Sequence, residues 1–436
     1  MVEAMGEEEK FDAIVVGAGP AGVAAAITMA KAGLQVVLIE KGSRPGAKNV
    51  MGGILYKHML EEIVGPAWAS APVERPIIEE QRWLMTPDAA LRFGHRNLRN
   101  RLDPHSFSVL RARFDPWFAE QAEAAGVFLI NETLVSELIV NGGGVIGVKT
   151  GREDDLLADV VVVCEGIGLG SKLLQSAGLK APVRPDQVAM AVKEVLKLDA
   201  DRIEARFNCD HGEGATVECY GDATMGMAGF MFIYTNRDTL SVGGGALLKD
   251  FVDSGRSPNQ LLEHFKAHPL ITPLLEGAET VEFSAKMIPE AGYRGIPKLF
   301  GDGYLVCGDA AMLSNPVHRE GSNLAMTSGR LAGETVIEAK ARGDFSARSL
   351  ASYRRRLEKS WVLPDMRKYD RAVPLLENNP RLLSLYPNLA DRAVDEFLRV
   401  DGVSKWAKQK KIFKMFRREG GVRMVVDMAK ALWTLK

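Results

Sequence analysis

The chain has few cysteines, and none of them falls in a metal-binding pattern. Among 436 residues there are four, and no two form a C-x-x-C pair; they are Cys164, Cys209, Cys219 and Cys307. Structural zinc sites and iron–sulfur clusters are held by closely spaced cysteines. We therefore expect this chain to hold no metal or cluster of its own, and to keep its thiols reduced.

Long apolar runs and strong net charge are also lacking. No apolar run approaches the roughly 18 residues of a membrane-spanning helix, and the acidic first residues do not resemble a secretory signal. The formal net charge of −1 gives no reason to expect nucleic-acid binding. These features predict a cytoplasmic protein that does not cross a membrane.

Positive charge is nevertheless concentrated near the end of the chain. Residues 403–436 contain ten Lys or Arg and two acidic residues. If Gly420-Gly421 separates two helices, the second has an apolar stripe made of Val422, Val425, Val426, Ala429 and Trp433. Basic amphipathic helices with aromatic side chains bind anionic membrane surfaces. Packing on the rest of the chain or on a partner protein explains the pattern equally well, so the sequence leaves both interpretations open.

The N-terminal segment carries the pattern of a dinucleotide site. A short apolar strand runs into the turn Gly17-Ala18-Gly19-Pro20-Ala21-Gly22, and a second apolar strand ends just before Glu40. Gly17 permits the tight turn, Gly19 lets the backbone approach a pyrophosphate, and Gly22 allows the following helix to pack on the sheet. The amides at that helix's N-terminus then face the phosphates. Glu40 is placed to accept hydrogen bonds from ribose hydroxyls.

Hydrophobic periodicity predicts an α/β fold with two further regions. A β-α-β unit at 11–40 and a hairpin at 134–148 precede a stretch of strands from about 187 to 286, in which no helix is predicted before Pro258. A buried strand at 303–309 resumes the first domain. We predict a discontinuous Rossmann-type nucleotide-binding domain, an inserted β-rich substrate domain, and a helical C-terminal region with a basic tail. The nucleotide-binding domain is predicted to comprise residues 10–75, 106–185 and 286–342. The substrate domain comprises 76–105 and 186–285, and the C-terminal region comprises 343–436.

Three other segments resemble those of flavin hydroxylase-like proteins, and they narrow the nucleotide to FAD. Arg111 lies in a segment that resembles the family's L-R-x-x-F-D element, whose arginine contacts the pyrophosphate and ribose. Gly166 ends a segment that resembles an A-D-G element. Asp309 belongs to one that resembles a G-D-A element, whose carboxylate binds the ribityl chain.

A narrower resemblance is to the electron transfer flavoprotein:quinone oxidoreductase group, and to its FixC-like members in particular. Residues 46–53, 288–293 and 319–326 resemble that group's loop beside the flavin ring and its segments flanking the G-D-A turn. Geranylgeranyl reductases share much of the pattern. The resemblance implies FAD-dependent electron transfer from an electron transfer flavoprotein heterodimer to a membrane quinone. It also implies a separate ferredoxin-like iron–sulfur partner, with electron bifurcation upstream left open.

The resemblance and the glycine pattern together give a set of candidate site residues. Tyr293 is a candidate to hydrogen-bond a quinone carbonyl, or else a buried structural tyrosine, and His318 and Arg319 are candidates for proton delivery. The amides of the helix starting near Ser322 are expected to stabilise negative charge on reduced flavin. The candidate cofactor-binding residues are Gly17, Gly19, Pro20, Ala21, Gly22, Glu40, Lys41, Gly52, Gly53, Arg111, Val135, Gly166, Gly308, Asp309, Gly321, Ser322 and Asn323.

Other functions fit the same pattern. A geranylgeranyl or other prenyl-lipid reductase has the same FAD domain but acts on an isolated alkene without a protein donor. A flavin relay subunit holds FAD but does not reduce quinone. The favoured interpretation places the protein in the cytoplasm, peripherally bound at the cytoplasmic face of the membrane.

Overall fold

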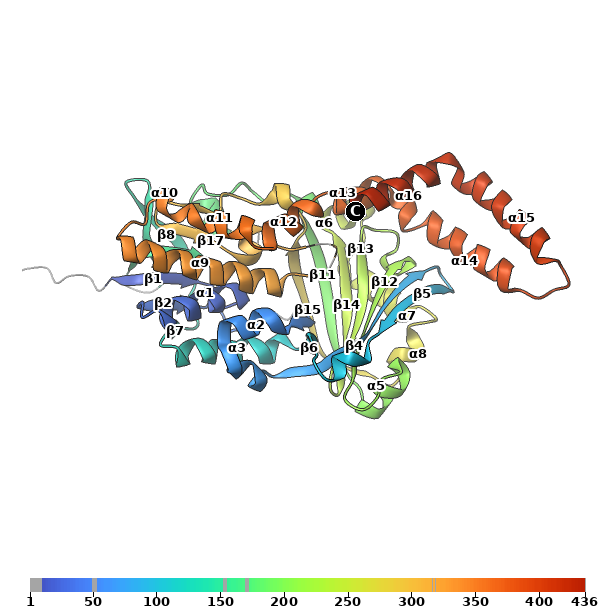
Figure 1. Cartoon of the computed structure of the whole chain (residues 1–436), viewed down its shortest axis with the longest axis horizontal. Helices are drawn as coiled ribbons and strands as arrows, with labels where there is room; N and C mark the ends of the chain where they lie inside the picture. The colour runs from blue at the N-terminus through green and yellow to red at the C-terminus, as the bar shows by residue number, and fades with distance from the viewer. Residues whose placement is uncertain are drawn as a thin grey trace, which may run out of the picture. The chain divides into compact units, whose positions relative to one another are not determined.

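The computed structural model describes residues 10–48, 53–151, 155–168, 172–315, 317 and 319–435. The chain folds into two compact units, which Figure 1 shows with their helices and strands labelled. Unit 1 comprises Met1–Val73, Val109–Arg184 and Met287–Arg367, and unit 2 comprises Glu74–Ser108, Pro185–Lys286 and Lys368–Lys436. The assignment of nucleotide and substrate binding to particular domains stays a prediction.

Unit 1 is built on a mostly parallel sheet. Its strand order is β16-β17-β10-β1-β2-β7, and the β8–β9 hairpin joins it by antiparallel pairing of β9 with β10. The pairs β1–β2, β1–β10, β10–β17 and β2–β7 are parallel. The strands of this sheet are β1 (Phe11–Val16), β2 (Val36–Ile39), β7 (Phe128–Ile130), β8 (Val135–Asn141), β9 (Gly144–Thr150), β10 (Leu156–Val163), β16 (Phe300–Gly301) and β17 (Tyr304–Val306). Unit 1 also contains β3 (Ile54–Tyr56), which is not part of this sheet.

Two helices of unit 1 pack with almost no side chain between them. A Cβ on Gly329 of α9 would collide with the carbonyl oxygen of Ala21 in α1, and one on Gly333 would lie 2.8 Å from the Cβ of Thr28. This contact lets the two helices pack closely against each other. The helices of unit 1 are α1 (Pro20–Lys31), α2 (Lys57–Val64), α3 (Arg111–Ala124), α4 (Lys172–Ser176), α9 (Ser322–Arg342), α10 (Ala347–Leu350), α11 (Ser352–Lys359) and α12 (Val362–Lys368), with short 3₁₀ turns at Gly65–Ser70, Tyr293–Gly295 and Gly308–Ala311.

Unit 2 contains a mixed sheet. Its strands run in the order β15-β11-β14-β13-β12-β4-β6, and β5 pairs with β4. The pairs around β13 and β14 are antiparallel, whereas β12 runs parallel to β4. The strands are β4 (Val73–Met85), β5 (Ala90–Arg96), β6 (Ser106–Val109), β11 (Val188–Lys197), β12 (Gly214–Gly221), β13 (Gly229–Thr235), β14 (Thr239–Leu247) and β15 (Glu279–Pro289).

The helices of unit 2 include two that the sequence pattern did not predict. Residues 187–258 were expected to be free of helix, but α5 (Ala200–Phe207) and α6 (Leu248–Ser254) lie there. α5 buries only Ile203 and Phe207, too few apolar positions for a clear helical period. The other helices are α7 (Pro258–Ala267), α8 (Thr272–Leu275), α13 (Ala372–Asn378), α14 (Leu385–Leu398), α15 (Lys405–Met415) and α16 (Gly421–Leu435).

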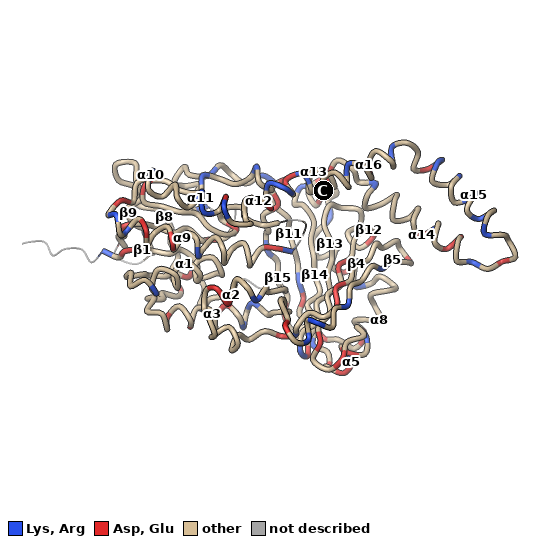
Figure 2. Tube along the Cα trace, viewed as in Figure 1, with Lys and Arg blue, Asp and Glu red and all other residues tan. Residues whose placement is uncertain are grey.

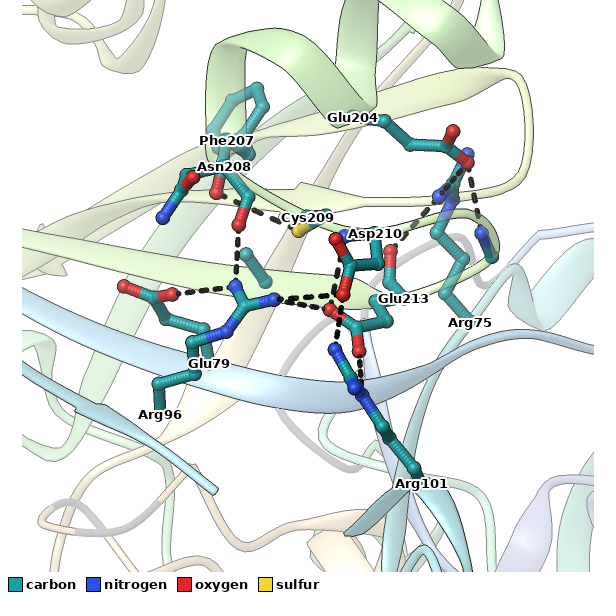
Figure 3. Close-up of polar contacts among 12 residues, drawn as sticks. Arg75, Glu79, Arg96, Arg101, Glu204, Phe207, Asn208, Cys209, Asp210 and Glu213 are labelled. Carbon is teal, nitrogen blue, oxygen red and sulfur yellow. Dashed lines mark hydrogen bonds and ion pairs between the residues drawn. The ribbon is translucent and has the colours of Figure 1, made fainter. Parts of the chain in front are cut away.

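Charged side chains form a dense cluster in unit 2, which Figure 3 shows. The buried carboxylate of Glu213 binds Arg96, with Nη2 to Oε2 at 2.6 Å, and also binds Arg101. The buried Arg75 binds Glu204 at 2.8 Å and donates to the carbonyl oxygen of Glu213 at 2.9 Å. The cluster therefore ties β4, β5 and the loop before β12 together.

We expect Glu213→Ala to lower the free energy of unfolding by about 3 kcal/mol, because it leaves Arg96 and Arg101 without their central partner. Urea titration measures this change. The matched control is Asp253→Ala, which breaks the exposed Lys249–Asp253 pair on α6 and should cost less than about 0.5 kcal/mol. Equal losses in the two variants would show that the cluster contributes no more than a surface pair.

The C-terminal helices confirm the predicted break at Gly420-Gly421. A π-helical turn continues α15 over Phe416–Gly420, and α16 begins at Gly421, whose φ is 60°. The apolar stripe of α16 points outward, since Val422 is 81% and Trp433 65% exposed, while Asp427 is buried. The stripe is therefore mostly exposed, although the Arg371 guanidinium lies 4.8 Å from the centre of the Trp433 ring.

Candidate functional site

A glycine turn joins β1 to α1 at the carboxyl edge of the parallel sheet. Gly17 has a φ of 102°, and a Cβ there would collide with the carbonyl oxygen of Cys164, so only glycine fits without strain. A Cβ on Gly22 would likewise collide with the Gly17 carbonyl, whereas Gly19 faces open space. α1 begins at Pro20 without a side-chain cap, which leaves the amides of its first turn to an anion.

Glu40 is held beside that turn. Its Oε2 accepts a hydrogen bond from the Ala18 amide at 3.1 Å, and its Oε1 accepts one from the Gly42 amide at 2.6 Å. Each carboxylate oxygen has a second lone pair. Glu40 is thus anchored by the backbone and still able to accept a hydrogen bond from a ribose hydroxyl.

A buried ion pair lies in the first turn of α3. Arg111 Nε lies 2.5 Å from Asp115 Oδ1, and its Nη2 lies 2.7 Å from Oδ2. Burial acts to lower the pKa of Arg111, but the charges of Asp115 and Asp309 outweigh it and leave the pKa raised. Arg111 and Asp309, which are far apart in the sequence, are therefore electrostatic neighbours.

The G-D-A turn follows β17 and approaches α1 closely. Gly308 has a φ of 60°, and its amide donates to Ser328 Oγ at 3.0 Å. A Cβ on Gly308 would lie 3.0 Å from the Cβ of Ala21. Asp309 therefore belongs to the same edge of the sheet as the glycine turn, where ligands of open α/β sheets bind.

The start of α9 carries buried polar atoms that make no hydrogen bond within the described part of the chain. They are Oδ1 of Asn323 and Oγ1 of Thr327, one helical turn apart and 1% and 2% exposed. The N-cap, Gly321, provides no side-chain hydrogen bond. Buried polar groups are normally paired. These atoms, together with the open space at Gly19, fit a bound nucleotide cofactor with a polar ring.

The remaining predicted cofactor residues occupy loops and element starts. Lys41 acts electrostatically on Glu165, and the Gly53 carbonyl accepts a hydrogen bond from the Val109 amide at 2.9 Å. Val135 begins β8, Ser322 begins α9, and Gly166 has a φ of 74°. Gly52 and His318 lie outside the described residues. The binding roles of all these residues stay predictions.

Two candidate catalytic residues are described. The hydroxyl of Tyr293 accepts a hydrogen bond from Arg367 Nη2 at 2.9 Å, and that guanidinium lies 4.9 Å from the centre of the ring. The phenol can still donate its own hydrogen. Arg319 has a φ of 55°, a strained conformation that is often found at functional sites. Contact of either residue with a substrate stays a prediction.

Sequence reasoning missed two ionisable groups with unusual surroundings. Glu290 follows β15 directly, and burial raises its pKa to about 8. Lys180 lies after α4. Burial lowers its pKa to about 8, although the negative charges of Glu165 and Asp309 act to raise it. The segment 288–293 drew attention to the region of Glu290, but no local pattern distinguishes Lys180.

Comparison with known proteins decides the family. Residues 372–435 match the model of the ETF-QO/FixC family C-terminal domain, and residues 12–189 match that of FAD dependent oxidoreductases. The chain is 45% identical to Protein FixC of Azorhizobium caulinodans, over 94% of this chain and 95% of that protein. It is 40% identical to the probable electron transfer flavoprotein-quinone oxidoreductase YdiS of Escherichia coli, over 98% of this chain and 100% of that protein.

The chain belongs to the ETF-QO/FixC family. This confirms the predicted resemblance, and the chain is an FAD-dependent oxidoreductase that acts in electron transfer. Among solved structures, a geranylgeranyl bacteriochlorophyll reductase-like protein of Thermoplasma acidophilum has a TM-score of 0.73 at 21% identity, covering 94% of this chain and 96% of that one. At that identity the likeness shows the fold alone. Together with the FAD dependent oxidoreductase match over residues 12–189, it confirms the predicted α/β class with a Rossmann-type FAD domain.

Two features are absent from the described residues of this ETF-QO/FixC family member. No helix there has the length and apolar character needed to cross a membrane. No group of three or more His, Cys, Asp or Glu side chains there has a metal-binding arrangement.

Proposed function

We propose that this chain passes electrons from an electron transfer flavoprotein, through or alongside a separate ferredoxin-like iron–sulfur protein, to a membrane quinone. The observation that carries the proposal is its near full-length similarity to a protein named a probable electron transfer flavoprotein-quinone oxidoreductase. The C-terminal family match supports it over the same region that exposes apolar side chains. FixC relatives at 40–45% identity add further support.

In this proposal the residues at the carboxyl edge of the unit 1 sheet hold FAD. The glycine turn and the first amides of α1 bind the pyrophosphate, Glu40 binds the adenosine ribose, and Asp309 binds the ribityl hydroxyls. Arg111 offsets the negative charge there, while Asn323 and the amides after Gly321 contact the ring. FAD, when bound, supplies the exchange of electrons singly or in pairs.

Glu290 is the group we assign to proton supply. Quinone reduction consumes protons as well as electrons, and a carboxyl with a pKa of about 8 is mostly protonated at neutral pH. Such matching of pKa to operating pH is what general acids require. Tyr293, three residues later, is the candidate donor to a quinone carbonyl, with His318 and Arg319 as further candidates for proton delivery.

The decisive test is anaerobic quinol formation by the FAD-loaded protein, reconstituted with reduced electron transfer flavoprotein and the ferredoxin-like protein. We expect quinol only when the protein donors are present. FAD reduction without quinol would instead identify a relay subunit. Turnover of a prenyl alkene by the chain alone would identify a lipid reductase, the alternative for which the solved neighbour supplies a shared fold.

A membrane contact follows from the need to reach a lipid-soluble quinone. Within unit 2, α14 and α15 run side by side and extend away from the strands (Figure 1). We call residues 385–435 the C-terminal hairpin. It exposes a set of large apolar side chains, which includes Leu398, Val400, Val403, Trp406, Phe413, Val422, Val425, Leu432 and Trp433. Apolar surface of this extent marks an interaction site.

Charge on the same hairpin favours an anionic membrane as the occupant. Figure 2 shows basic residues spaced along α15, and Lys410 lies 3.4 Å from the centre of the Trp406 ring. At the tip, the buried Lys408 binds Asp401 at 2.8 Å and the Arg399 carbonyl at 2.5 Å, which fixes the loop that carries Val400. Basic and aromatic side chains together suit the interface of an anionic bilayer.

We expect the triple variant Trp406→Ser, Phe413→Ser, Trp433→Ser to bind phosphatidylglycerol vesicles at least about tenfold more weakly than the wild type, since each side chain loses apolar burial. Vesicle flotation measures the affinity. Phe93→Ser, which removes an exposed aromatic outside the hairpin, should bind as the wild type does. Unchanged flotation of the triple variant would refute the membrane contact.

A further inference from the structure

Lys180 makes a long-range contact with the G-D-A turn. It is half-buried in unit 1, four residues after the end of α4. Its Nζ donates to the carbonyl oxygen of Ala310 at 3.0 Å. Ala310 directly follows Asp309 in the 3₁₀ turn Gly308–Ala311. The ammonium is therefore hydrogen-bonded to the residue next to Asp309, which is predicted to bind the ribityl chain.

Two carboxylates that follow neighbouring strands act electrostatically on this ammonium. Asp309 follows β17 and Glu165 follows β10, which pair in parallel, and both act electrostatically on Lys180. Glu165 is itself held in place, since its two oxygens accept hydrogen bonds from the amides of Leu173 and Leu174, each at 3.4 Å.

The neighbouring cations act on those carboxylates from two other elements. Lys41, after β2, acts on Glu165. Arg111, at the start of α3, acts on Asp309. Lys180 therefore interacts with two acids, Glu165 and Asp309. Lys41 also acts on the first of these and Arg111 on the second.

We propose that Lys180 is a positioning residue of the FAD site, which holds the G-D-A turn and keeps the Asp309 carboxylate directed at the ribityl chain. The inference rests on the assignment of Asp309 to FAD. The ammonium acts through the turn and contacts no reacting atom. Hydrogen bonds to charged groups are about twice as strong as neutral ones, so the loss of this charge weakens the turn.

The arrangement makes FAD affinity depend on pH. Burial lowers the pKa of Lys180 from its ordinary 10.5 to about 8, so the ammonium is present below that pH and lost above it. The affinity for FAD should therefore fall as pH rises through about 8. Burial also raises the pKa of Glu165, against the hydrogen bonds from Leu173 and Leu174 and the charges of Lys180 and Lys41.

The test is the dissociation constant of FAD from apoprotein, measured by flavin fluorescence between about pH 6.5 and about 9.5. We expect Lys180→Met to bind FAD about tenfold more weakly than the wild type at pH 7. The FAD affinity of this variant should not change as pH passes through about 8. Lys180→Arg should bind well over the whole range, because a guanidinium stays charged. Thermal melting of each apoprotein separates misfolding from loss of affinity.

Lys31→Met is the matched control, because Lys31 donates to the Ile63 carbonyl at 2.7 Å on another part of unit 1. It should retain both the affinity and the pH profile of the wild type. Wild-type binding by Lys180→Met, or a fall near pH 8 that persists in Lys180→Arg, would overturn the proposal. The measurement uses neither electron donor nor quinone, so its failure is distinct from failure of the proposed electron transfer.

Discussion

A Gly17→Ala variant is expected to lose both its fold stability and its FAD. The φ of 102° at Gly17 is strained for any other residue, and the added Cβ would collide with the Cys164 carbonyl on the neighbouring strand β10. Strain and overpacking each cost about 1–3 kcal/mol. We therefore expect the free energy of unfolding to fall by about 3 kcal/mol or more, measured by urea titration, and FAD to be absent from the purified protein.

Two companion variants separate the causes. Gly19→Ala places a methyl group in open space and should leave the fold intact, but it obstructs the approach of a pyrophosphate and is expected to weaken FAD binding by about 100-fold. Gly33→Ala has the same kind of strained φ, at 85°, with no neighbour to collide with. It should cost about 1 kcal/mol of stability and retain FAD. Full FAD affinity in Gly19→Ala would contradict the assigned pyrophosphate site.

Replacement of Glu290 with glutamine is expected to have the largest effect on the proposed reaction. The carboxyl holds its proton up to a pH of about 8 because burial disfavours the charged form. We expect the wild-type rate of quinone reduction to fall as pH rises through about 8. With FAD kept saturating, Glu290→Gln should be about 100-fold slower at pH 7 and lack that pH dependence, as expected for loss of a general acid.

The Glu290 carboxyl also makes the stability of the fold depend on pH, with stability falling as pH rises. A carboxyl whose pKa is raised in the fold contributes stability below its unfolded pKa of about 4.3, and this is lost as pH rises through about 8. Over that range the wild type should lose stability relative to Glu290→Gln. Glu279→Gln, an exposed carboxyl at the start of the same strand, is the control and should alter neither profile. A wild-type pH–rate profile in Glu290→Gln would exclude Glu290 as the proton source.

The sequence by itself determined the local parts of this protein. The glycine turn, the acid after β2, the β8–β9 hairpin and the break at Gly420-Gly421 all depend on steric or periodic rules that act over a few residues. Those rules hold whatever the rest of the chain does. Other short segments, among them 46–53, 288–293 and 319–326, carried the resemblance to the family, so the FAD chemistry was also predictable before the fold.

Only the tertiary structure decided which distant groups meet. The pairing of β10 with β17 brings Glu165 and Asp309 to the same edge of a sheet, and Lys180 then reaches Ala310 across 130 positions. No local period encodes such a contact, because strand order and register set it. The outward direction of the α16 stripe was likewise decided only by the tertiary structure. The stripe is visible in the sequence, but which way it faces depends on the packing of Asp427 against α14, where Tyr386 donates to it at 2.6 Å.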